Sequence, residues 1–297
     1  MKLNKRPYTG IIAFLIVLFS MPVGHAMMVL VQVILGETYQ FVGAAAVGIV
    51  GLVCLLLSLR FVGENARTAL GLLAGVLMWT GFVEFSFVYY AMQLQIPPVM
   101  ENGEVVTKPE YLVLPSSIGL VVSLMACLLL NGQTRCNFFM WLRRRFRMKI
   151  AYTSNAKTKN YAVVTAMETI FVLWVTYIMM MIVYSYGDRE WPTWAMFFGC
   201  LLWSLYLLWR LLKHAKIGPA LRYAVPTVVI FWMSVEVLGR WGFFTEIWAH
   251  PTEYVLEVGL IAAALVGAIL LVRFLPDRER GPKGDGKGRS ESADEAP

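Results

Sequence analysis

The segment GIIAFLIVLFSMPVGHAMMVLVQVIL, from Gly10 to Leu35, contains no Asp, Glu, Lys or Arg. An α-helix needs roughly 20 mostly apolar residues to cross the hydrocarbon core of a bilayer, so this segment is long enough to span a membrane. Of the 297 residues, 58% are hydrophobic and only 15% are charged, which excludes a water-soluble globular domain. The sequence therefore predicts an all-α integral membrane protein with eight transmembrane helices, at residues 10–35, 41–59, 68–95, 111–131, 161–186, 192–212, 220–244 and 253–275.

Lys and Arg are distributed unequally between the two sets of predicted connections. One set, together with both termini, holds nearly all of these residues, whereas the opposite set holds only Lys108 and Arg189. Positively charged connections are retained on the cytoplasmic side of a membrane. We therefore expect a multi-pass protein of the inner (cytoplasmic) membrane with cytoplasmic N- and C-termini. The net charge of +7 follows from this topology and does not indicate a nucleic-acid partner.

The two halves of the chain share an internal similarity. Residues Trp79–Glu84 align with Phe231–Glu236 at an offset of 152, and Gly36 aligns with Gly187 at an offset of 151. We therefore predict two four-helix repeats, and an even number of spans in each makes them parallel in the membrane. The predicted units are a first repeat with a basic cytoplasmic segment from about residue 135, a second repeat and a disordered cytoplasmic tail, at residues 1–148, 149–275 and 276–297.

Five ionisable side chains within the predicted spans require a partner or a function, because a charge at the bilayer centre costs roughly 2.5 kcal/mol or more. They are His25, Glu84, Glu168, Glu236 and Arg240. Glu84 and Glu236 occupy equivalent positions of the two repeats, so we expect their carboxylates to face each other as a proton- or cation-binding site. Arg240 follows Glu236 by one helical turn, so a structural ion pair is the alternative. Glu168 lies nearer the cytoplasmic end of its span, where it either joins this site or reaches interfacial water.

His25, Glu84 and Glu236 also form a candidate ligand set for a transition metal, since imidazole and carboxylate bind iron, manganese and zinc. Met21 and Met28 share the helix face of His25, and thioether ligands with imidazole favour Cu(I). A single intramembrane histidine excludes a bis-histidine haem, and the absence of CxxC excludes a c-type haem. No span contains Lys, so a retinal Schiff base is excluded. The identity of any cofactor stays open.

A basic stretch interleaved with aromatic residues, Trp141–Lys149, follows the fourth predicted span. Such a segment suits a surface position on anionic lipid headgroups at the cytoplasmic face. The alternative is a topology anchor that makes no specific lipid contact. The candidate lipid-binding residues are Arg143, Arg144, Arg145, Arg147 and Lys149.

Absent motifs narrow the function further. The chain has no GxxxxGK[ST], GxSxG or HExxH, so it is not an ATP-driven pump, an α/β-hydrolase or a zincin. Paired intramembrane acids in a duplicated fold favour a secondary transporter or channel-like protein for a proton or small cation. Two alternatives stay open. One is an integral membrane metalloenzyme or a quinone- or lipid-handling subunit of a redox complex, and the other is a non-catalytic component of a membrane assembly.

Overall fold

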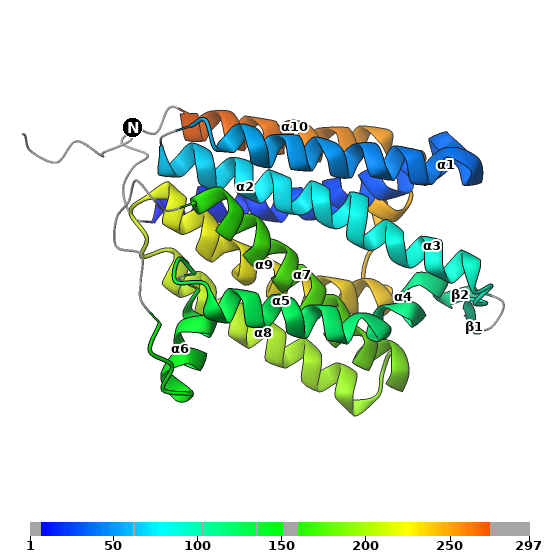
Figure 1. The fold of residues 1–297 in the computed structure, drawn as a ribbon. Coiled ribbons are helices and arrows are strands. Elements are labelled where there is room, and N and C mark those ends of the chain that lie inside the picture. The colour runs from blue at the N-terminus through cyan, green and yellow to red at the C-terminus, as the bar shows by residue number, and fades with distance from the viewer. Residues whose placement is uncertain (1–6, 62, 102–103, 135, 151–159, 274–297) are drawn as a thin grey trace, which may run out of the picture.

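The computed structural model describes residues 7–61, 63–101, 104–134, 136–150 and 160–273, which are almost entirely helical. The elements are α1 (Tyr8–Ser58), α2 (Glu64–Met78), the π-helical segment η1 (Trp79–Glu84), α3 (Phe85–Gln93), β1 (Val99–Glu101), β2 (Glu104–Thr107), α4 (Pro109–Val113), the 3₁₀ helix η2 (Leu114–Ser117), α5 (Ile118–Leu130), α6 (Asn137–Arg145), α7 (Tyr161–Tyr186), α8 (Trp191–Leu211), α9 (Ile217–Arg240), the 3₁₀ helix η4 (Ile247–Ala249) and α10 (Val255–Arg273) (Figure 1). The prediction of a helical chain is confirmed. The sequence did not predict the antiparallel β1–β2 hairpin. The predicted tail, residues 276–297, lies outside the described residues.

Within the described part of the chain, 6 helices are long and apolar enough to cross a membrane. A seventh apolar helix, Val255–Leu271, is shorter. The six long helices are Tyr8–Ser58, Glu64–Gln93, Pro109–Leu130, Tyr161–Met181, Trp191–Leu211 and Ile217–Arg240. The chain therefore has the architecture of a multi-pass helical membrane protein.

Helix α1 combines the first two predicted spans in one element. A straight α-helix of its 51 residues would be about 75 Å long, more than twice the hydrocarbon thickness of about 30 Å. Gly36 interrupts the helix with φ 60° and ψ −177°, and α1 folds back there into a hairpin with two arms, residues 8–35 and 37–58 (Figure 1). Met28 from the first arm and Ala44 from the second belong to one buried cluster. A positive φ favours glycine, which explains why the turn falls at this residue.

The helix that follows α1 runs through α2, η1 and α3 without a break. Its π-helical turn, Trp79–Glu84, lies against the second arm of α1. A Cβ atom at Gly81 would collide with the backbone of Ala44 and Gly48, so this glycine permits the close approach of the two helices. The π-helical turn ends at Glu84, and such turns often occur at functional sites.

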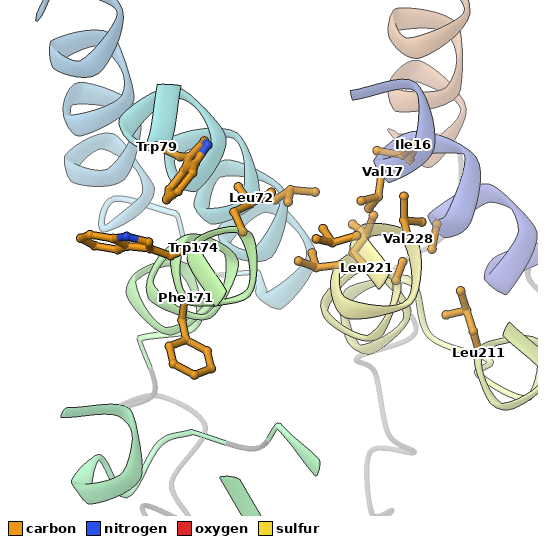
Figure 2. Packing of buried hydrophobic residues seen from close by; sticks show 14 of the residues in the cluster. Ile16, Val17, Leu72, Trp79, Phe171, Trp174, Leu211, Leu221 and Val228 are labelled. Carbon is orange, nitrogen blue, oxygen red and sulfur yellow. The ribbon is translucent and has the colours of Figure 1, made fainter. Parts of the chain in front are cut away.

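The core lies between helices that are distant in sequence. Helix α2 packs against α7, and α1 packs against α9 and α10. Figure 2 shows this packing, with side chains from α2 and α7 on one side and from α1 and α9 on the other. In α9, 61% of the most apolar window is buried, compared with 17% in α8 and 22% in the helix that ends with α5. Helices α5 and α8 therefore lie on the exterior of the bundle, as does the most apolar part of α1, which is also 22% buried. The core residues labelled in Figure 2 include Leu72, Trp79, Trp174, Ile16, Leu221 and Val228.

Arg143 does not lie on the lipid-facing surface that the sequence predicted for it. Its side chain is 1% exposed and donates hydrogen bonds to the carbonyl oxygens of Leu128 (2.9 Å), Leu129 (2.8 Å) and Asn131 (2.6 Å). These carbonyls belong to the end of α5, where no further helical turn supplies N–H donors. The guanidinium therefore caps the helix, and its five N–H donors suit that geometry. The other four predicted residues, Arg144, Arg145, Arg147 and Lys149, are exposed.

The cap predicts that two neighbouring arginines of α6 contribute very different amounts to the free energy of unfolding. Arg143→Ala leaves the buried carbonyls of α5 without their donor, so we expect it to lower the free energy of unfolding by about 3 kcal/mol. The matched control Arg144→Ala changes an exposed side chain and should leave stability within about 0.5 kcal/mol. Thermal denaturation of both variants in detergent measures the difference. Equal melting temperatures would contradict the capping role.

Candidate functional site

Four polar side chains from four helical segments meet inside the bundle. His25 comes from the first arm of α1, Glu84 from the end of η1, Tyr177 from α7 and Glu236 from α9. The Tyr177 hydroxyl lies 3.1 Å from His25 Nε2 and donates to Glu84 Oε1 at 3.4 Å. His25 Nε2 lies 3.8 Å from Glu236 Oε1. The four side chains form a continuous series of polar contacts, which we call the polar network.

Each carboxylate of the network also interacts with a side chain one helical turn earlier. Trp232 Nε1 donates to Glu236 Oε1 at 2.6 Å, and the Thr80 side chain hydrogen-bonds Glu84. Residues four apart lie on the same face of a helix, so each helix supplies both the carboxylate and its donor. Each carboxylate is therefore also held by a donor from its own helical segment.

Two small cavities adjoin the polar network. A cavity of about 30 Å³ is lined by His25 and Glu236, and one of about 10 Å³ is lined by Glu84. Tyr111 and Tyr177 line both cavities and form the wall between them. The larger cavity exceeds the roughly 10–15 Å³ that one water molecule needs. Each carboxylate thus borders a space of its own.

Aromatic rings surround the centre of the network. The Tyr177 ring centroid lies 5.4 Å from that of Trp79 and 6.2 Å from that of Tyr111. On the Glu236 side, the rings of Trp232 and Trp248 lie 4.9 Å apart. Such packing lines the surroundings of the polar groups with apolar ring surface.

The structure partly agrees with the expectation that Glu84 and Glu236 face each other. Both carboxylates point into one site, but Tyr177 and His25 lie between them and connect them. Tyr177 was missed, because tyrosine is common in membrane-spanning helices. The signal that could have found it is its separation of 152 residues from His25, which equals the offset between Glu84 and Glu236.

The predicted metal ligands His25, Glu84 and Glu236 all belong to the polar network. Among the described residues, however, no group of three or more His, Cys, Asp or Glu side chains is arranged to hold a metal ion. His25 contacts Tyr177 and Glu236, whereas Glu84 reaches the histidine only through the Tyr177 hydroxyl. The arrangement is a linear series of hydrogen-bonding groups rather than a shell around one point.

Arg240 ion-pairs with a different acid from the one that the sequence predicted. Its Nε donates to Asp188 Oδ1 at 2.6 Å, in the connection between α7 and α8. Trp241 donates its indole N–H to the backbone carbonyl of Asp188, which fixes that connection beside the C-terminal end of α9. Arg240 therefore forms an ion pair between segments, and its charge also acts on Glu236 within α9. Glu236 contacts Trp232 and His25.

Glu168 lies on α7, two and a half turns before Tyr177. Its carboxylate interacts with the Cys136 thiol at the start of α6. Burial and, less strongly, the charge of Glu168 raise the pKa of Cys136 to about 11. Glu168 therefore belongs to the α6–α7 contact at the end of the bundle opposite the β1–β2 hairpin (Figure 1).

Glu246 is a further acidic residue near the network, and the sequence analysis did not select it. It lies in the connection between α9 and η4, and a Cβ atom at Gly239 would collide with its carboxylate. Burial and, less strongly, the charge of the nearby Glu236 raise the pKa of Glu246 to about 7, against the opposing charges of Arg240, Lys108 and His250. Glu246 therefore takes up a proton in a range where an exposed glutamate is ionised.

The shifted pKa of Glu246 predicts a pH dependence of stability. Since the folded chain holds this proton more tightly than the unfolded chain, stability should fall as the pH rises from the model-peptide value of 4.5 to about 7, and then level off. Thermal denaturation in detergent between these pH values measures the slope. Glu246→Gln, which cannot ionise, should reduce it. An unchanged slope in the variant would assign the pH dependence to other groups.

No protein-family model, curated protein or solved structure matches this chain. The functional inference therefore depends on the polar network and its surroundings. Those surroundings are a helical bundle with the length and apolarity of membrane spans, and four hydrogen-bonding groups that join its helices.

Proposed function

We propose that the chain is a secondary transporter or channel-like protein for a proton or small cation, and that the polar network is its binding site. The observation that carries this proposal is the bridge from Glu84 through Tyr177 and His25 to Glu236, with steps of 3.4, 3.1 and 3.8 Å. Carboxyl, phenol and imidazole groups can each donate and accept a proton. The series therefore offers a proton a path between the two cavities.

The energetics of the membrane support a proton or monovalent cation at this site. An ionised carboxylate in the centre of a bilayer costs roughly 2.5 kcal/mol or more, so two of them favour any species that neutralises them. A bound proton does so without a coordination shell. The described residues offer no such shell of three or more His, Cys, Asp or Glu ligands. These facts favour proton-linked transport over a role as a resident metal site.

We further propose eight membrane spans, arranged as two parallel repeats with both termini in the cytoplasm. The two arms of α1, separated at Gly36, are each long enough to cross the bilayer, and α10 supplies a further apolar helix. At an offset of 152, Glu84 corresponds to Glu236 and His25 to Tyr177. The same offset exchanges the Tyr177–Glu84 and His25–Glu236 contacts with each other. A pseudo-twofold axis through the His25–Tyr177 pair accounts for this exchange.

This symmetry suggests a transport mechanism. Two repeats related by an axis along the membrane normal can rock against each other about a site at their interface. In that motion Glu84 and Glu236 remain attached to their own helices, while the three contacts of the network, each of which joins one repeat to the other, form and break. A proton held by the network would then be exposed in turn to the two cavities.

The exposed part of the basic segment supports binding to anionic lipid headgroups at the cytoplasmic face. Trp141 is 60% exposed and Phe146 is 65% exposed, beside the exposed Arg144, Arg145 and Arg147. Aromatic and cationic side chains together suit the interfacial region of a membrane. This partner is proposed for the segment without Arg143, whose guanidinium caps α5.

The proposed function predicts that each network carboxylate is required for proton flux. Glu84→Gln and Glu236→Gln keep the side-chain shape but cannot carry the proton, so flux should fall by at least about tenfold. A pH-sensitive dye enclosed in proteoliposomes measures flux under an imposed potential. The matched control Glu257→Gln alters an exposed residue of α10 and should leave flux unchanged. Wild-type flux in both network variants would refute the proposal, and loss of both proteins from the membrane would favour a structural role.

The proposed topology predicts opposite accessibility at the two ends of the second arm of α1. Glu37 is the first residue of this arm, Arg60 lies just beyond its last residue, and both are exposed. In a chain that lacks its own cysteines, Glu37→Cys should react with a membrane-impermeant maleimide added to intact cells. Arg60→Cys should react only after the cells are opened. Equal labelling of the two sites would contradict a membrane crossing between them.

A further inference from the structure

Three sulfur atoms lie together between α8 and α9, beside the polar network. Cys200 Sγ lies 3.6 Å from Met196 Sδ and 3.8 Å from Met233 Sδ. Cys200 is 5% exposed and Met233 is 3% exposed. Met180 from α7 belongs to the same buried cluster. None of these sulfur-bearing side chains takes part in the proposed proton path, so a function of the cluster does not depend on that path.

Helix geometry explains how the three sulfurs meet. Met196 and Cys200 are four residues apart on α8 and therefore share one face of that helix. Helix α9 packs along this face, and the Ser234 hydroxyl donates to the Phe197 carbonyl at 3.3 Å across the same contact. The residue before this serine is Met233, whose thioether reaches Cys200. Two packed helices thus fix the positions of the three sulfur atoms.

The sulfur spacing matches the ligand spacing around a metal ion. With metal–sulfur distances of about 2.3 Å, sulfur ligands in tetrahedral or trigonal geometry lie about 3.8–4.0 Å apart. The two distances at Cys200, 3.6 and 3.8 Å, are close to these values. Each methionine sulfur therefore already lies at a ligand-like distance from Cys200, and flexible methionine side chains can adjust around an ion.

We propose that Cys200, Met196 and Met233 bind a monovalent soft metal ion of the Cu(I) class. Thiolate and thioether are the ligands that select Cu(I) over hard cations. On binding, a Cu(I)–sulfur bond forms at Cys200, the thiol S–H bond breaks, and its proton is released to water with no change in oxidation state. One positive ion and one thiolate make a neutral complex. Neutrality is what a site among apolar helices requires, because an uncompensated charge there is costly.

The larger cavity gives this site an approach from the polar network. Met233, Met180, Met21 and His25 all line that cavity. The thioether of Met233 therefore borders both the cavity and the Cys200 thiol. An ion that enters the cavity meets soft ligands on its way to Cys200. The proposed metal site is therefore reached from the cavity past methionine side chains.

Competition with bicinchoninate, a chromophoric Cu(I) chelator, tests the proposal on the purified full chain under anaerobic, reducing conditions. The natural chain should retain one Cu(I) ion per molecule, and X-ray absorption should find sulfur neighbours at about 2.3 Å. Cys200→Ser should weaken binding by at least about tenfold. In Met233→Leu the leucine has nearly the shape of the methionine, and this variant should also weaken Cu(I) binding by at least about tenfold. It keeps the test valid if the serine variant fails to fold.

Matched controls separate this site from other sulfur atoms and from the polar network. Cys127→Ser changes an exposed thiol of α5 and should retain the full Cu(I) affinity, as should Met125→Leu on the same helix. His25→Gln should retain one Cu(I) ion even if proton flux is lost. Each of three results would overturn the proposal. They are a natural chain that does not hold Cu(I), an X-ray absorption spectrum with nitrogen and oxygen neighbours alone, and Cu(I) binding that is lost in His25→Gln but kept in Cys200→Ser.

Discussion

The rest of the structure depends on one constraint: polar side chains within apolar helices must satisfy each other. Water is not available in the hydrocarbon region, so an unpartnered carboxylate or imidazole there is costly. Glu84, Tyr177, His25 and Glu236 solve this problem jointly, and each belongs to a different helical segment. The positions of α1, η1, α7 and α9 relative to one another are therefore tied to the contacts of the polar network.

Local backbone features make this convergence possible. Gly36 turns α1 back on itself, and Gly81 lets the π-helical turn approach the second arm of α1 at backbone distance. The π-helical turn ends at Glu84 and sets the direction of its carboxylate. At the C-terminal end of α9, the ion pair between Arg240 and Asp188 fixes the helix that carries Glu236. The packing of α8 against α9 brings three sulfur atoms together at Cys200.

The sequence predicted those features that apolar periodicity and rare charges reveal. Long uncharged segments predicted a helical chain, and His25, Glu84 and Glu236 were identified because ionisable residues are rare in such segments. Tyr177 was missed because an aromatic residue in a span carries no such signal. Arg143 was misplaced because a run of arginines does not show which one turns inward to cap α5. The ion pair of Arg240 joins segments about 50 residues apart, and spacing along one helix cannot indicate it.

Proton flux through Tyr177→Phe in proteoliposomes tests the central claim most directly. The substitution removes one oxygen atom and keeps the ring that packs against Trp79 and Tyr111, so folding should be preserved. Without the hydroxyl, Glu84 loses its contact with His25. If the polar network is the proton path, Tyr177→Phe should lower the flux by at least about tenfold and leave the melting temperature unchanged. Flux equal to that of the natural chain would contradict it.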